Sequence, residues 1–194
     1  MSLISRIAQN SLKRPVDGTT VTFNELWKDQ RCVIVFFRRW GWPYCRLAAR
    51  EISAIQPLLV KNDVKLIGVG VEQFGVDEFI EGRFLDGDVY IDEGKKSYAA
   101  LDFKTMSFLQ LIPAVISATA RAAQAAAKSL GLGGNMDGDK WQNGGCLVVE
   151  KGGGDKPLLH YVQKSAPDHV SNVDVLNSLE IKEEPPAATP VPKL

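Results

Sequence analysis

The sequence is poor in the residues that build disulfide frameworks and metal sites. It contains three cysteines and two histidines among 194 residues. An odd number of cysteines without a repeated spacing argues against a disulfide framework. Because proteins without a disulfide framework are typical of a reducing compartment, we expect a cytoplasmic protein. His160 falls in a strand pattern and His169 in a loop, and neither has a cysteine or carboxylate at the spacing of a zinc site, so we expect no metal.

A net charge and long apolar segments are also lacking. Lysine plus arginine and aspartate plus glutamate number 23 each, which gives no basis for binding nucleic acid or an anionic membrane. The N-terminal segment has no apolar core of the kind that signal peptides carry. Residues 106–120 are uncharged, but they are too short to cross a bilayer and contain Pro113. The composition therefore predicts a soluble globular protein.

The sequence does contain a buried strand that leads directly into a helix. Residues 32–37 (CVIVFF) form the continuous apolar run expected of a strand covered on both faces. After a short turn, Pro43 occupies a position suited to the start of a helix. Cys45 falls in the first turn of that helix, where free backbone N–H groups and the helix dipole favour a thiolate. This arrangement is the geometry of thioredoxin-like redox sites.

The remaining pattern alternates strands and helices, which predicts an α/β fold. The apolar run 65–71 completes a β-α-β unit with parallel strands, and Pro57 should kink the helix of this unit or end it early. Before this unit we expect an extended pair around Asp17-Gly18 and a short helix capped by Asn24. Later elements are expected at 75–82 (helix), 88–91 (strand), 92–101 (helix), 117–130 (Ala-rich helix), 146–150 and 158–162 (β-hairpin), and 171–180 (helix).

We expect one domain over residues 1–181, followed by a disordered tail over residues 182–194. The tail, KEEPPAATPVPKL, has no periodicity that would form a core. Glycines are frequent at 131–139, but they follow a helix rather than a strand. A dinucleotide-binding glycine loop is therefore not expected there.

Five separated segments carry a family signal. They are RRWGWPYCRLAARE, KLIGVGVEQFG, VYIDEGKKSYAALDFK, GNMDGDKWQNGGCLVV and LLHYVQKS. They occur in order over about residues 15–181, with the Ala-rich insertion and the two glycines before the late strand. Together they resemble the peroxiredoxin-like prostamide/prostaglandin F synthases, which are related to selenoprotein U. The resemblance implies a thioredoxin-like (peroxiredoxin-like) mixed sheet flanked by helices.

The resemblance also implies an activity and a site. Members of the family reduce the endoperoxide of prostaglandin H-type lipids and their ethanolamides to F-type products, with NADPH as electron donor. The expected site is a Cys-x-x-Cys, in which one thiolate attacks a peroxide oxygen and the other closes a disulfide. This chain has Trp42 where the first cysteine belongs and keeps only the second, Cys45. Because tryptophan forms neither a thiolate nor a disulfide, the two-cysteine cycle cannot run here as in the family.

Three interpretations of Trp42 are open. The first is that the reduction chemistry has been lost or changed. The second is that a selenocysteine codon, UGA, which differs by one base from the tryptophan codon UGG, has been decoded as tryptophan, or that tryptophan was introduced by engineering. The third is that Cys45 has a new partner. Cys146 is the candidate for that partner, provided that the two Cα atoms lie within about 7 Å. The simpler interpretation is that Cys146 is a small buried residue, as Cys32 is expected to be.

The residues of the turn have two interpretations each. Arg38 and Arg39 either stabilise a thiolate or a peroxide oxygen, with Arg39 preferred because it is closer, or they are solvated residues at a strand end. Trp40 and Trp42 either form an exposed aromatic patch for a lipid substrate or pack on a neighbouring loop. The spacing does not separate these alternatives.

Together these features predict a thiol-dependent oxidoreductase that reduces lipid endoperoxides, with Cys45, position 42 and Arg39 as its site. NADPH rests on the resemblance alone, and thioredoxin or another dithiol is the alternative electron donor. The competing hypothesis is a catalytically silent relative that acts as a binding module through the same cleft.

Overall fold

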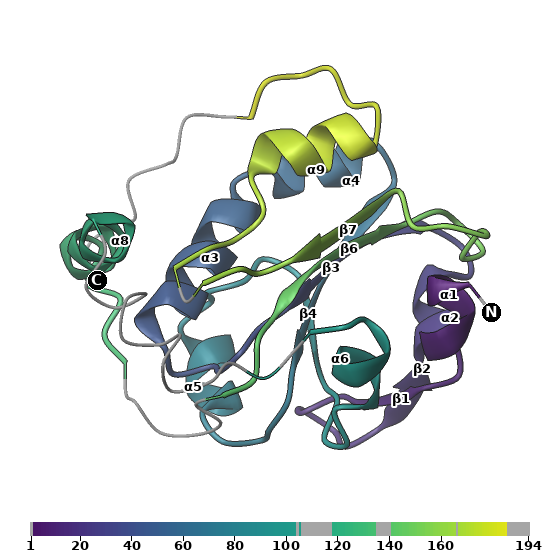
Figure 1. Cartoon of the computed structure of the whole chain (residues 1–194), viewed down its shortest axis with the longest axis horizontal. Helices are drawn as coiled ribbons and strands as arrows, with labels where there is room; N and C mark the ends of the chain where they lie inside the picture. The colour runs from purple at the N-terminus through teal and green to yellow at the C-terminus, as the bar shows by residue number, and fades with distance from the viewer. Residues whose placement is uncertain (1, 104, 106–117, 135–140, 166, 186–194) are drawn as a thin grey trace.

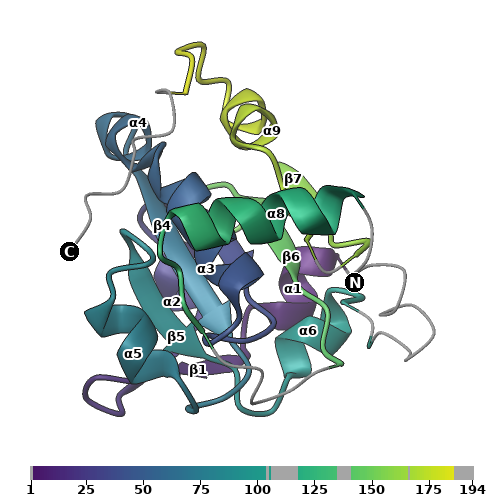
Figure 2. The same cartoon turned by 90° about the vertical axis from the view of Figure 1, so that its left-hand side faces the viewer.

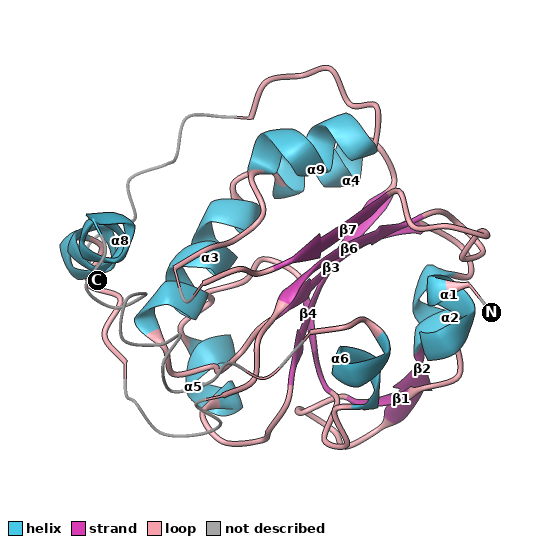
Figure 3. Ribbon diagram, viewed as in Figure 1, coloured by secondary structure: helices cyan, strands magenta, loops and turns pink. Residues whose placement is uncertain are grey.

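A mixed sheet of seven strands lies at the centre of the described part of the chain in the computed structural model (Figures 1 and 3). The structure describes residues 2–103, 105, 118–134, 141–165 and 167–185. In spatial order, the strands are β2 (Thr20–Thr22), β1 (Ser11–Lys13), β5 (Asp88–Ile91), β4 (Val64–Gly70), β3 (Arg31–Phe36), β6 (Gly145–Val149) and β7 (Leu159–Val162).

The three central strands β5, β4 and β3 are parallel, and the outer pairs are antiparallel. The parallel pairing of β3 with β4 confirms the predicted β-α-β unit, whose crossover helix returns the chain to the same edge of the sheet. The antiparallel pairing of β6 with β7 confirms the late hairpin. The extended pair before the unit is confirmed as β1 and β2.

Helices cover both faces of the sheet (Figure 1). On one face lie α3, α4, α5 and α9, and on the other lie α1, α2 and α6. A hydrophobic core lies on each face of the sheet, and strand β3 contributes side chains to both. Val33 and Val35 point to the first face, and Ile34 and Phe36 point to the second. The described helices are α1 (Leu3–Ile7), α2 (Phe23–Trp27), α3 (Pro43–Ser53), α4 (Gln56–Lys61), α5 (Val76–Glu81), α6 (Lys96–Ala100), α8 (Ala118–Ser129) and α9 (Asn172–Ser178).

Two local expectations have different outcomes. Pro57 does end the first helix early: α3 stops at Ser53, and Pro57 lies in the first turn of α4. Asn24, however, is not a helix cap. Thr22 is the N-cap of α2, where it forms a capping box with Glu25. The prediction was wrong because Asn24 already lies inside the helix.

The Ala-rich helix α8 packs on the outer side of α3 (Figure 2). A small apolar cluster of Leu47, Ala127 and Leu132 joins the two helices. No described helix combines the length and the apolar character that crossing a membrane requires. The predicted tail lies mostly outside the described residues, and its disorder stays a prediction, as do the domain bounds.

Candidate active site

The turn from β3 to α3 is held by neighbouring strands. The Trp40 indole Nε1 donates a hydrogen bond to the Glu72 carbonyl, 2.7 Å away. The Trp40 ring lies flat against β4, which is why residue 70 is a glycine: a Cβ there would lie 2.2 Å from the ring. The Tyr98 hydroxyl, 2.7 Å from the Phe37 carbonyl oxygen, fixes the end of β3 from the other face. The turn therefore has a defined shape before α3 begins.

Trp42 is the N-cap residue of α3 and is buried, with 5% of its surface exposed. The guanidinium carbons of Arg38 and Arg39 lie 4.3 and 4.2 Å from the centre of its ring, within the range of cation–π contacts. Arg38 also donates a hydrogen bond through Nε to the Gln142 carbonyl, at 2.8 Å. The interpretation of the two arginines as solvated strand-end residues is wrong, since they are 1% and 3% exposed.

The interpretation of Trp40 and Trp42 as an exposed aromatic patch is also wrong, because Trp40 is fully buried. Its ring packs against Phe37 and Phe79. Both tryptophans are buried, and the Trp40 indole contacts the neighbouring loop after β4 through its hydrogen bond to the Glu72 carbonyl. A large aromatic ring gains more from burial here than it would from exposure to water.

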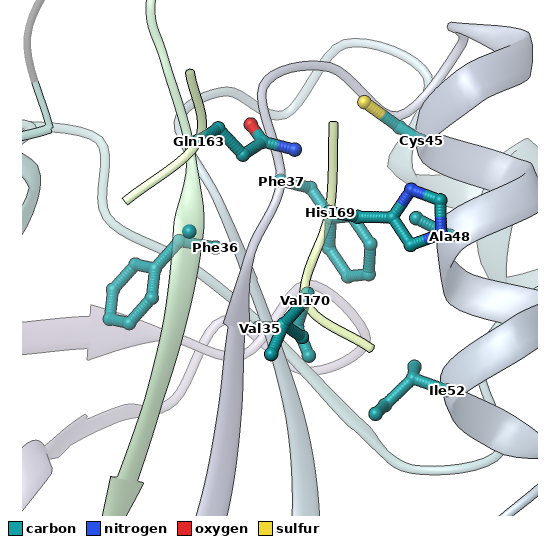
Figure 4. A pocket seen from close by; sticks show the side chains of 10 residues that line it. Val35, Phe36, Phe37, Cys45, Ala48, Ile52, Gln163, His169 and Val170 are labelled. Carbon is teal, nitrogen blue, oxygen red and sulfur yellow. The ribbon is translucent and has the colours of Figure 1, made fainter. Parts of the chain in front are cut away.

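Cys45 lies in the first turn of α3, as predicted, and is 5% exposed. It lines a pocket together with Ala48 and Ile52 of the same helix (Figure 4). These three residues are spaced so that they lie on one face of α3. Cys45 thus reaches a cavity, whereas Trp42 does not line it.

The pocket is small and mostly apolar. Its volume of about 20 Å³ is room for roughly one water molecule. Cys45 and His169 are the ionisable side chains among its ten lining residues. The lining residues are Val35, Phe36, Phe37, Cys45, Ala48, Ile52, Gly145, Gln163, His169 and Val170.

His169 is a site residue that sequence reasoning missed. Its Nε2 forms an ion pair with Glu51 of α3, and its Nδ1 lies 3.1 Å from the Pro167 carbonyl oxygen. The hydrogen bond to Glu51 is the main reason that the pKa of His169 is raised, although burial opposes it. No local signal marked this residue, since the loop between β7 and α9 brings it to α3 only in the folded chain.

The other two cysteines are interior thiols. Cys32 lies on β3, and Cys146 lies on β6 opposite Val35. Burial raises the pKa of both thiols to about 12. All three cysteines are free, so the described chain contains no disulfide between Cys45 and Cys146. Cys146 occupies the place of a small apolar side chain in the core that also contains Cys45.

The segment that follows α8 lies directly on the turn. Arg46, which is buried, donates hydrogen bonds to the Trp40 carbonyl at 3.2 Å and to the Gly133 carbonyl. It also forms an ion pair of 2.9 Å with Glu78. A Cβ at Gly134 would lie 2.1 Å from the Gly41 carbonyl oxygen, so the two backbones touch. Residues 133 and 134 therefore cover the turn that precedes α3.

No three His, Cys, Asp or Glu side chains in the described ranges are grouped so that they could hold a metal ion. The site consequently offers a thiol, an imidazole paired with a carboxylate, and two buried guanidinium groups around an indole. Of these groups, only the thiol can exchange electrons with a peroxide. Arg39 contacts Trp42 and does not line the pocket of Cys45.

Comparison with known proteins adds a family and a fold. Residues 51–165 match the model of the AhpC/TSA antioxidant enzyme family. The chain is 42% identical to a pig prostamide/prostaglandin F synthase, covering 93% of this chain and 89% of the relative. It is 41% identical to the human protein of the same name, covering 96% of this chain and 94% of the relative.

Solved structures agree in architecture. PrxQ from Xylella fastidiosa superposes with a TM-score of 0.62 at 12% identity, covering 93% of each chain. The bacterioferritin comigratory protein from Xanthomonas campestris gives a TM-score of 0.57 at 13% identity, covering 92% of this chain and 93% of that chain. At such identities the likeness concerns the fold alone, and it confirms the predicted thioredoxin-like (peroxiredoxin-like) mixed sheet.

Proposed function

The chain belongs to the prostamide/prostaglandin F synthase family, and from this membership we propose that it reduces a lipid endoperoxide through Cys45. Its family and fold are those of thiol oxidoreductases. The proposed substrates are prostaglandin H-type endoperoxides and their ethanolamides, and the products are the corresponding F-type prostaglandins. The substrate class is taken from the name that the relatives share and from the family resemblance.

The observation that carries this proposal is the position of Cys45. It lies at the start of α3 and lines the pocket described above, whereas neither Cys32 nor Cys146 lines that pocket. Because the pKa of each of those two thiols is raised to about 12, they are almost entirely protonated at neutral pH. Only a thiolate is an effective nucleophile toward a peroxide oxygen. Cys45 is therefore the thiol that we assign to the reaction.

The proposed reaction needs one thiol of this chain and one external dithiol. The Cys45 thiolate attacks one peroxide oxygen; a sulfur–oxygen bond forms, the oxygen–oxygen bond breaks, and the departing alkoxide takes a proton. A thiolate of the donor then attacks the sulfur and releases the second alkoxide, which also takes a proton. The second donor thiol resolves the mixed disulfide. One endoperoxide and one dithiol thus give one diol and one disulfide.

The external dithiol replaces the sulfur that Trp42 removes. We propose thioredoxin or a similar dithiol protein as the immediate donor. Since the pocket holds roughly one water molecule, the lipid would present only its peroxide bond to Cys45 and remain largely outside.

The described residues offer no Rossmann-type site for NADPH. In such a site the pyrophosphate lies on a glycine-rich turn between a strand and a helix. The turn from β3 to α3 has one glycine, Gly41, and is filled by buried Trp40 and Trp42. The turn from β4 to α5 also has a single glycine, Gly75. We therefore propose that NADPH does not bind to this chain, and that it instead supplies electrons to the protein that reduces the dithiol donor.

One observation favours the second candidate, a catalytically silent binding module. Trp42 is buried at the position of the family's first cysteine and is in contact with both Arg38 and Arg39. The arginines that would face a thiolate at this position instead face an indole. The codon of residue 42 bears on this choice: UGA with a selenocysteine-insertion element favours the enzyme, and UGG favours loss or an altered cycle.

The test is turnover of a prostaglandin H-type endoperoxide with a dithiol reductant, followed by mass spectrometry of the F-type product. The unmodified protein should form the F-type product, and Cys45→Ser should reduce the rate of product formation to that of the dithiol alone. Cys146→Ser serves as the control that removes a thiol outside the pocket. Turnover that survives in Cys45→Ser would remove the site assignment, and no turnover in any protein would favour the binding module.

A further inference from the structure

An ion pair lies at the same pocket as Cys45. Glu51 is on α3, one residue before Ile52, which lines the pocket, and its carboxylate contacts Nε2 of His169. Figure 4 shows His169 reaching across from the loop after β7 toward the face of α3 that carries Cys45 and Ala48. The pair thus joins the loop to the helix that bears the proposed nucleophile.

Both ring nitrogens of His169 face oxygen acceptors. Nε2 faces the Glu51 carboxylate, and Nδ1 lies 3.1 Å from the carbonyl oxygen of Pro167. An imidazole can donate from both nitrogens only when it carries two protons and a positive charge. The surrounding oxygens therefore stabilise the imidazolium form.

The other charged and titratable groups near His169 have their own partners. Asp168 accepts hydrogen bonds from the Tyr161 hydroxyl at 2.6 Å and from the Lys164 backbone N–H at 2.7 Å. On α9, Asp174 accepts from the Ser171 hydroxyl at 2.7 Å. On α3, Glu51 contacts the histidine, and Cys45 lines the same pocket as His169. Glu51 is consequently the carboxylate that orients the ring.

A cation in a small, mostly apolar pocket acts strongly on a neighbouring anion, because little water screens it. The lining side chains other than Cys45, Gln163 and His169 bear no polar group. A histidinium beside a cysteine favours the thiolate form, as other cations do. His169 is the only one of the lining residues whose side chain can carry a positive charge.

We propose that His169, held by Glu51 and the Pro167 carbonyl, is a positioning residue whose positive charge assists the nucleophilic reaction of Cys45 in this pocket. The inference rests on the proposed function for its biological meaning, since it concerns the same thiol. The proposal adds the pair of His169 and Glu51 to the residues that assist Cys45. His169 is far along the sequence from the turn between β3 and α3. The role requires the charge of His169 rather than its shape.

The test is the rate at which iodoacetamide alkylates Cys45, measured from pH 5 to pH 10 and assigned by peptide mass spectrometry. This readout needs no endoperoxide, so it is independent of turnover. Relative to the protein as written, His169→Gln should lower the alkylation rate at pH 7 about tenfold and leave the rate at pH 10 nearly unchanged. Glu51→Gln should lower the rate in the same direction but less, because His169 then loses the partner that raises its pKa.

Two further variants separate charge from structure. His169→Lys keeps a positive charge and should retain most of the alkylation rate at pH 7. His160→Gln is the matched control, because His160 lies on β7 against Phe103 in the core of the opposite sheet face. It should leave the rate unchanged. Circular dichroism spectra should show that each variant is folded.

The outcomes are distinct. The proposal is overturned if the alkylation profile of His169→Gln coincides with that of the unmodified protein. It is also overturned if Cys45 is alkylated no faster at pH 7 in His169→Lys than in His169→Gln. A shifted profile without endoperoxide turnover supports the role of His169 and contradicts the proposed function. Turnover with an unshifted profile supports the function and contradicts the role of His169.

Discussion

The guanidinium group of Arg39 stacks on the indole ring of Trp42, with 4.2 Å between its central carbon and the ring centre. Both side chains are buried next to the start of α3, and Trp42 is the N-cap residue of that helix. Arg38 makes a second contact of the same kind. An aromatic ring that two cations stabilise thus occupies position 42, for which the family resemblance implies a cysteine.

Trp42→Cys should raise the turnover of a prostaglandin H-type endoperoxide. A cysteine at position 42 lies three residues before Cys45 at the helix start, so a disulfide can close within the chain. Resolution would then be intramolecular rather than bimolecular, and we expect an increase of about tenfold at low dithiol concentration. The measurement is the initial rate of F-type product formation over a series of dithiol concentrations.

The same substitution should lower stability. Replacing a buried tryptophan by a small side chain typically lowers the free energy of unfolding by about 3–5 kcal/mol. Trp42→Phe keeps an aromatic ring under the arginines and serves as the control, with a smaller loss. Chemical denaturation measures both. Equal stability of the three proteins would contradict the packing role of Trp42, and unchanged turnover in Trp42→Cys would contradict the expected rescue.

Gly134→Ala tests the covering of the turn by the segment after α8. A Cβ at residue 134 would lie 2.1 Å from the Gly41 carbonyl oxygen, and a backbone atom cannot rotate away as a side chain can. We expect a loss of about 1–3 kcal/mol in unfolding free energy and faster alkylation of Cys45. Gly133→Ala is the matched control, because a Cβ there meets no atom within 4 Å. Identical behaviour of the two variants would show that this segment does not press on the turn.

The ion pair of His169 with Glu51 should make stability depend on pH. A histidine whose pKa is raised by folding stabilises the protein fully below the pKa of the unfolded chain, about 6.5. That contribution is lost as the pH rises through the raised pKa of the folded state. The unfolding free energy of the protein as written should exceed that of His169→Gln by up to about 1 kcal/mol at pH 6, and by less at pH 9.

Glu51→Gln should reduce the same dependence, since the carboxylate is the main cause of the raised pKa. Denaturant unfolding curves at the two pH values provide the measurement. A difference between His169→Gln and the protein as written that is equal at both pH values would mean that the pair contributes no charge-dependent stability.

The sequence predicted the elements that depend on local pattern. The apolar run 32–37 and Pro43 located the central strand and its helix, because burial on both faces and a fixed φ at a helix start leave clear signals. Cys45 was therefore placed in the first turn correctly. The Ala-rich helix and the late hairpin followed from composition and turn residues in the same way.

The sequence could not predict contacts that arise from long-range packing. Arginines are usually exposed, so nothing local indicated that Arg38, Arg39 and Arg46 would be buried. Arg46 is satisfied by Gly133, which is distant along the chain. His169 reaches Glu51 only because the loop before α9 returns to α3. Each of these residues has an ordinary sequence context and acquires its role through the tertiary fold.

The central claim is that Cys45 is the nucleophile that reacts with a peroxide. The most direct measurement treats the reduced protein with one equivalent of a lipid hydroperoxide in the absence of any dithiol, traps sulfenic acid with dimedone, and locates the adduct by mass spectrometry. A thiolate that attacks the hydroperoxide becomes a sulfenic acid as the lipid is released as an alcohol. We expect a dimedone adduct on Cys45 and none on Cys32 or Cys146. An unmodified Cys45, or an adduct on either of the other two cysteines instead, would show that Cys45 is not the nucleophile.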